Sequence, residues 1–131
     1  MNHEDKNISE YHVPVAGFTQ FVVAEPGSKM IFISGLTARL EDGTVGAVGD
    51  VVGQAELLLT SMRRMLESVG SSMGDVVRIV TYLTDIEDHH KMHEVRRKHF
   101  GDTPPASTSV GIVRLFHPDQ LIEIEATAIV K

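Results

Sequence analysis

The chain has 131 residues, 42% of them hydrophobic and 23% charged, which is typical of one soluble globular domain. Its formal net charge of −6 argues against nucleic-acid binding, because that affinity comes from phosphates neutralised by Lys and Arg. It has no cysteine, which excludes disulfides and thiolate chemistry. No apolar run approaches the roughly 20 residues that span a bilayer. We therefore expect a cytoplasmic protein with no membrane partner.

The first third of the chain predicts strands. Residues 1–12 are polar, lack an apolar signal core and are expected to form a flexible tail. Two strands, at 20–23 and 29–35, are separated by a Pro-Gly turn, which predicts a β-hairpin. A further extended segment is expected near 36–40.

The clearest predicted helix spans 51–69, where apolar residues recur at helical spacing. Asp50 is placed to cap its first turn, and Gly70 lies where a glycine often follows a helix. A strand is expected at 75–83, followed by a second, weakly amphipathic helix over 85–100.

Two strands, at 107–115 and 121–130, close the chain. One face of the last strand is apolar: Ile122, Ile124, Ala126, Ala128 and Val130. The other face mixes acids with hydrophobes: Leu121, Glu123, Glu125, Thr127 and Ile129. The predicted order is β-β-(β)-α-β-α-β-β, an α+β fold with both helices on one sheet face. A mixed face of this kind is usually either partly exposed to solvent or packed against another copy of the chain, so we expect an oligomer.

Glu123 and Glu125 are the first candidates for chemistry. Two residues apart on one strand, their positions are separated by about 7 Å. Repulsion and partial burial are expected to raise the pKa of at least one toward the range useful for proton transfer. The alternative is that both face solvent or pair with Arg78, Arg114 or Lys131.

The second predicted helix is rich in histidine and basic residues. His89 and His93, at i and i+4, could together hold a metal, but zinc sites normally need three protein ligands. Exposed or hydrogen-bonded histidines are the favoured interpretation, and no metal is expected. The basic run 96–98 is interpreted as a solvated helix face.

Several short motifs occur in a characteristic order. They are Ile33-Ser34-Gly35, Gly74-Asp75-Val76-Val77, Tyr82-Leu83-Thr84-Asp85, Pro105-Ala106-Ser107-Thr108-Ser109-Val110, Arg114-Leu115 and Ile122-Glu123-Ile124-Glu125-Ala126. This series resembles the RidA/YjgF family of enamine/imine deaminases and extends over nearly all of the chain from about Phe18. The resemblance implies a single domain over 1–131 with a chorismate-mutase-like fold. It also implies a homotrimer with a central barrel, no cofactor, and ligand sites in clefts between subunits.

The resemblance also implies roles for individual residues. Glu123 matches the family's water-positioning glutamate. Ser34 and Gly35 match a strand-end segment that lines the pocket, and Phe18 falls where an aromatic residue, commonly Tyr, covers the ligand. His93 falls on a helix position that faces the pocket mouth.

The segment after Pro105 carries one match and one departure. Ser109 matches a pocket position often held by Cys. Ser107, in contrast, stands where deaminating members carry an arginine that forms two parallel hydrogen bonds with the substrate carboxylate. Loss of that pair is expected to cost about 2–5 kcal/mol in binding or transition-state stabilisation. Arg39, Arg78 or His93 could replace it from elsewhere.

Two functions therefore remain open. The first is hydrolysis of a small reactive imine or enamine, with altered or reduced activity on 2-imino acids. The second is a non-catalytic trimer that binds a small metabolite or serves a regulatory contact. Glu123 favours the first function; Ser107 and Phe18 favour the second.

Overall fold

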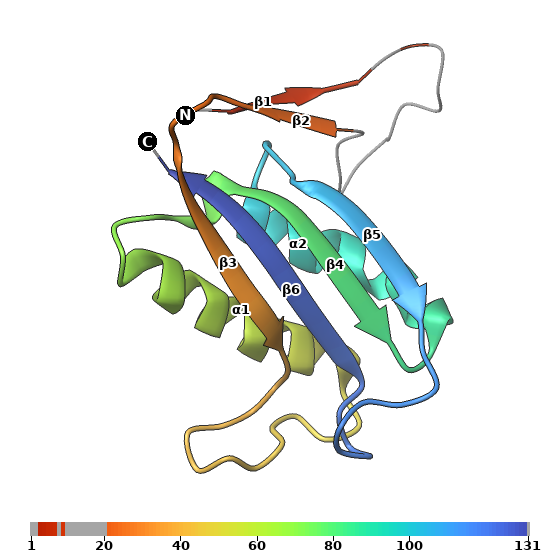
Figure 1. Cartoon of the computed structure of the whole chain (residues 1–131). Coiled ribbons are helices and arrows are strands. Elements are labelled where there is room, and N and C mark those ends of the chain that lie inside the picture. Colours follow the sequence, from red (N-terminus) through yellow and green to blue (C-terminus); the bar gives the residue numbers. More distant parts are fainter. Residues whose placement is uncertain (1–2, 8, 10–20, 131) are drawn as a thin grey trace.

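A computed structural model of the chain describes residues 3–7, 9 and 21–130 as a mixed four-stranded sheet, helices on one of its faces, and a two-stranded ribbon (Figure 1). The elements in chain order are β1 (His3–Lys6), β2 (Phe21–Ala24), β3 (Lys29–Leu36), α1 (Val51–Glu67), β4 (Val76–Leu83), α2 (Met92–Phe100), β5 (Ala106–Gly111) and β6 (Ile122–Val130). Short 3-10 helices, η1 (Met73–Asp75) and η2 (Ile86–Lys91), precede β4 and α2.

The order of strands in the main sheet is β3-β6-β4-β5. β6 runs antiparallel to both of its neighbours, while β4 and β5 are parallel and connected through α2. Both helices lie behind this sheet in Figure 1. The predicted α+β class, with two helices on one face, is therefore confirmed.

The core lies between the helices and the sheet because β6 alternates as predicted. Its side chains at Ile122, Ile124, Ala126 and Ala128 are buried against the helices. The stripe on α1 that meets them consists of Val51, Ala55, Leu58, Leu59, Met62 and Leu66. The other side of β6 belongs to the face of the sheet that the helices leave uncovered, which we call the open face.

The helix termini follow the predicted signals closely. The Asp50 side chain caps α1 by accepting a hydrogen bond of 2.9 Å from the Gly53 N–H. Gly70 has a positive φ of 78°, a conformation that glycine adopts without strain. The second predicted helix is two elements, since the chain forms the 3-10 helix η2 before α2 begins at Met92. No helix in the described part of the chain has the length and apolarity needed to cross a bilayer.

The predicted hairpin is wrong: β2 pairs with β1, in antiparallel register with Lys6 opposite Phe21, and β3 pairs with β6. β1 lies in the segment where the sequence predicts a flexible tail. The pairing was missed because a strand ladder uses backbone groups, and the polar side chains of β1 give no apolar alternation to detect. The segment 36–40 forms only an isolated bridge between Arg39 and Val45.

A buried glutamine on α1 fixes the start of β6. Gln54 is fully buried, and its amide Nε2 donates to the Asp119 carbonyl at 2.7 Å. Its Oε1 accepts from the Leu121 N–H at 2.9 Å. One side chain thus satisfies a backbone acceptor and a backbone donor at the point where the chain enters β6.

Replacing Gln54 with Leu should destabilise the protein by about 2–4 kcal/mol, because it leaves these two backbone groups without their partner. Urea unfolding measures the change. Glu67→Gln, an exposed position on the same helix, serves as the control and should stay within about 0.5 kcal/mol of wild type. Equal stability of all three proteins would show that Gln54 does not anchor β6.

Candidate functional site

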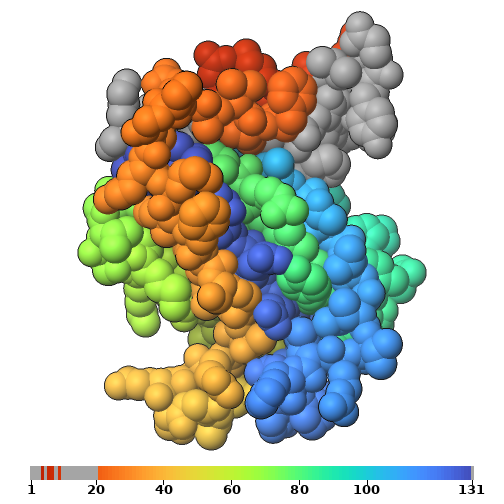
Figure 2. Space-filling view, in the orientation of Figure 1, coloured from red at the N-terminus to blue at the C-terminus, as the bar shows by residue number. Residues whose placement is uncertain are grey.

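The open face of the sheet contains a crevice of about 290 Å³. Its lining residues are Gly35, Tyr82, Ile112, Leu115, Glu123 and Glu125, and we call it the carboxylate crevice. Figure 2 shows this face, with atoms of β6 (dark blue) visible between those of β3 (orange) and β4 (green). Both carboxylates come from β6, whose opposite side is held in the core.

Glu123 lies directly against the backbone of Gly35. A Cβ atom added at position 35 would lie 1.8 Å from Glu123 Oε1, far inside van der Waals contact. The register of β3 against β6 shifts between Ile33 and Leu36, and Gly35 lies within this irregularity. A side chain at position 35 would therefore compete with the Glu123 carboxylate for the same space.

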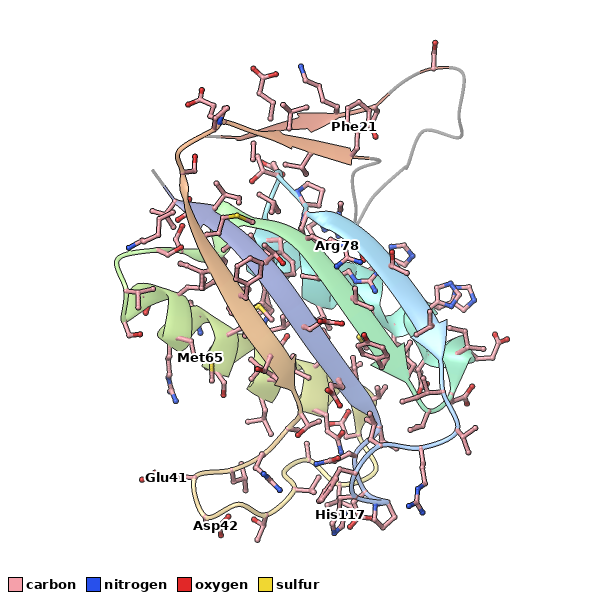
Figure 3. All side chains as sticks on the ribbon, viewed as in Figure 1. Phe21, Glu41, Asp42, Met65, Arg78 and His117 are labelled. Carbon is pink, nitrogen blue, oxygen red and sulfur yellow. The ribbon has the colours of Figure 1, made fainter. Side chains whose placement is uncertain are left out.

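Glu125 is held by a different neighbour. The Tyr82 hydroxyl, on β4, donates a short hydrogen bond to Glu125 Oε1. This bond raises the pKa of the Tyr82 phenol, and burial and the charges of both glutamates act in the same direction. Arg78, on the same face (Figure 3), opposes the shift. Within the described residues the Glu123 carboxylate has no hydrogen bond or ion pair, so all of its acceptor sites are available to a water molecule or a ligand.

One chain does not bring all the predicted site residues together. Glu123 and Gly35 meet in the crevice, and Ser34 is exposed beside Gly35 at the end of β3. Phe18 lies outside the described residues.

Ser107 and Ser109 lie on the side of β5 that faces the helices. Their register partners on β4 are Ile79 and Thr81, both buried beneath α2. His93 is exposed on α2, in the helix layer. Within one chain, these three residues are therefore separated from the carboxylate crevice by the sheet.

Arg96 departs from the sequence interpretation. The run 96–98 was expected to form a solvated face, and Arg97 and Lys98 are exposed, but Arg96 is only 6% exposed. Its Nη2 donates to Ser109 Oγ at 2.8 Å, and burial lowers the pKa of its guanidinium. The signal for its burial was spacing: Arg96 stands four residues after Met92 and four before Phe100, both buried.

The histidine pair does not have the expected helical spacing. His89 lies in η2, where its Nδ1 is 2.9 Å from the Ile86 carbonyl and its ring lies against His90, while His93 belongs to α2. No group of three or more metal-ligating side chains occurs within residues 3–7, 9 and 21–130.

A larger groove, of about 520 Å³, runs over the helix layer and is lined by charged residues of both signs. One of its two glutamates, Glu56, lies 2.7 Å from His99 Nε2 and 3.2 Å from Lys98 Nζ. Burial alone would raise the pKa of Glu56, but these hydrogen bonds outweigh burial and lower it. Glu56 is thus a paired group that links α1 to α2, whereas Glu123 has no such partner among the described residues.

The family model described as endoribonuclease L-PSP matches residues 10–130. The chain is 35% identical to a RutC family protein of Pyrococcus horikoshii, over 88% of each chain. It is 30% identical to the 3-aminoacrylate deaminase RutC of Acinetobacter baylyi, over 82% of this chain and 85% of that one. The crystal structure of YyfB, a Rid family protein of Yersinia pestis, superposes with a TM-score of 0.90 at 28% identity, over 99% of this chain and 100% of that one.

The hydrogen bond between Tyr82 and Glu125 predicts that the stability of the folded protein depends on pH in the alkaline range. Because the pKa of Tyr82 in the folded protein is raised above the unfolded value of about 10, the bond's contribution to stability is complete below pH 10. It is lost as pH rises through the folded-state pKa. In a Tyr11→Phe background, absorbance of ionised phenol at 295 nm reports Tyr82 alone, since the chain has two tyrosines. Glu125→Gln should lower the titration midpoint; an unchanged midpoint would contradict the assignment.

Proposed function

Because the chain belongs to the endoribonuclease L-PSP family, the RidA/YjgF proteins, we propose that it hydrolyses the C=N bond of a small reactive imine or of an enamine in equilibrium with it. The observation that carries this proposal is the asymmetry of the two carboxylates. Glu125 is occupied by Tyr82, whereas Glu123 lies unpaired among the described residues, in a crevice where a water molecule and a small ligand fit. The A. baylyi relative named as a 3-aminoacrylate deaminase supports the enamine class.

The chemistry assigned to Glu123 is general base and then general acid catalysis. Glu123 orients a water molecule and takes its proton as the water oxygen bonds to the imine carbon. The proton is returned to nitrogen in the resulting carbinolamine. As the C–N bond then breaks, Glu123 takes the hydroxyl proton of the carbinolamine and passes it to the departing nitrogen, so that ammonia is released and a carbonyl compound remains. Atoms balance without any oxidant, reductant or cofactor.

We further propose that the working site lies between copies of the chain in a homotrimer. Two observations support this. In one chain Ser107 and Ser109 are on the opposite side of the sheet from Glu123, so these serines can share one site with Glu123 when another copy brings its own β5 to the crevice. The open face also carries large exposed apolar side chains, including Phe32 on β3, which is 73% exposed. Exposed patches of this kind usually mark interaction surfaces.

One observation favours the alternative of a metabolite-binding trimer without turnover. Position 107, where the resemblance places a carboxylate-binding arginine, is a serine, which offers no charge. A trimer that kept the crevice but lost this arginine would bind a ligand without holding it for attack.

An ammonia-release assay on imino acids generated freshly by an amino-acid oxidase separates the two functions. Wild type should accelerate release, and Glu123→Gln should lower kcat by at least about 100-fold, the usual contribution of a positioned acid–base group. Glu67→Gln should retain full activity. An inert wild type would favour the alternative function, and a fully active Glu123→Gln would refute the role of Glu123.

Gly35→Ala tests the position of the carboxylate independently. The new methyl group displaces the Glu123 carboxylate, the movable end of a side chain, so stability should change by less than about 1 kcal/mol. Activity should fall by about 10–100-fold, as expected for a misplaced reacting group. Gly74→Ala is the matched control, because its Cβ would have its nearest contact at 3.5 Å, an ordinary distance. Equal activity of both variants would contradict the close packing of Glu123 on Gly35.

A further inference from the structure

A second polar cluster lies on the helix side of the sheet, between α2 and the β4–β5 pair. Among the described residues, two buried side-chain polar atoms lack a hydrogen-bond partner: Thr81 Oγ1 and Arg96 Nε. Both belong to this cluster. Thr81 stands in register with Ser109, and Ser109 Oγ accepts the single hydrogen bond that Arg96 makes, at 2.8 Å. We call Thr81, Arg96 and Ser109 the arginine cluster.

The arginine cluster has more hydrogen-bond donors than acceptors, and none of its three residues carries a negative charge. An arginine carries five N–H donors and no acceptor, and it keeps its charge at neutral pH. No carboxylate of the described residues forms an ion pair with Arg96. The Ser109 hydroxyl, which accepts from Arg96, still has its own proton to donate, and so does Thr81. A buried cation with no counter-ion is unfavourable, and a carboxylate that accepts two parallel N–H bonds is the group that fits a guanidinium best.

The cluster also lies next to the position where the family arginine is missing. Ser107 and Ser109 are two residues apart on β5 and face the same side, with their positions about 7 Å apart. β5 is the edge strand of the sheet, and both serines are only partly buried. The guanidinium of Arg96 therefore reaches the same strip of β5 from the neighbouring helix.

We propose that Arg96 supplies, from α2, the guanidinium that position 107 lacks, and binds the carboxylate of an anionic imine or enamine. Ser109, the register partner of the buried Thr81, adds its hydroxyl group to the subsite. This inference rests on the proposed function, since it names the substrate class of the same inter-subunit site: β5 of one copy holds the carboxylate, and Glu123 of the next copy faces the C=N bond. Arg96 thereby acts as a specificity-determining residue, and the chain remains selective for acids despite Ser107.

The first experiment measures binding without turnover. Pyruvate, the 2-oxo acid formed when 2-iminopropanoate is hydrolysed, is the probe, and pyruvamide is its uncharged counterpart. In ¹⁵N NMR of the wild type, pyruvate should shift the Nε–Hε resonance that is absent from Arg96→Met, and pyruvamide should not. Pyruvate should also raise the melting temperature. Equal responses to the two probes, or no response to pyruvate, would overturn the proposal.

The second experiment compares matched variants. Arg96→Met keeps the apolar stem and removes an uncompensated buried charge, so it should fold. Its Kd for pyruvate should rise by 10–100-fold. Arg97→Met makes the same change at the neighbouring, exposed residue and should bind like wild type.

Arg96→Lys keeps the positive charge but lacks the planar pair of N–H donors, so it should recover only part of the affinity. The double variant Arg96→Met/Ser107→Arg returns the guanidinium to β5 and should restore binding. Wild-type affinity in Arg96→Met would refute the assignment.

The same variants separate this proposal from the proposed function. If pyruvate binds through Arg96 but wild type releases no ammonia from imino acids, the carboxylate subsite stands and hydrolysis fails. If wild type hydrolyses imino acids and Arg96→Met has an unchanged KM, hydrolysis stands and the subsite fails. If both proposals hold, Arg96→Met raises KM for 2-imino acids by 10–100-fold and leaves KM for an uncharged imine unchanged.

Discussion

The alternation of β6 between Ile122 and Ala128 is the constraint on which the fold and the carboxylate crevice both depend. β6 lies between β3 and β4, so each of its side chains points either into the core or onto the open face. A slip of one residue would place Glu123 among the apolar residues of α1 and expose Ile122. The packing of Ile122 and Ile124 beneath the sheet therefore fixes the carboxylates above it. Fold stability and the position of the two carboxylates are specified by the same nine residues.

Two glutamates on one strand face become different chemical groups because of their cross-strand neighbours. Glu125 meets the Tyr82 hydroxyl on β4, and Glu123 meets the bare backbone of Gly35 on β3. The contact with Tyr82 gives Glu125 a hydrogen-bond donor, whereas the contact with Gly35 gives Glu123 none. An analogous asymmetry distinguishes the arginines of α2, since Arg97 is in solvent and Arg96 is enclosed beside Ser109. In both pairs, location rather than residue type determines what each side chain contacts.

The sequence predicts well the elements that a repeating apolar pattern defines. Helix α1 and strands β4 and β6, including the two faces of β6, follow from periodicity alone. The β1–β2 ribbon escapes prediction because backbone groups make its contacts and the polar side chains of β1 carry no pattern. Arg96 escapes because a charged residue is assumed to be exposed, although the spacing from Met92 to Phe100 places it on the buried side of α2. The resemblance places Glu123 and Gly35 in one pocket, but only the structure gives the steric reason for the glycine.

The Gln54 anchor has a consequence for how a ligand enters and leaves. Residues 117–121 precede β6 and could be mistaken for a lid, yet the amide of Gln54 ties Asp119 and Leu121 to the centre of the core. Segments bound to a core in this way open only with the cooperative unit that contains them. The segment that leads into β6 is therefore held to the core and does not open independently. In the proposed homotrimer, access to the crevice would then depend on motion between protomers rather than on motion of this segment.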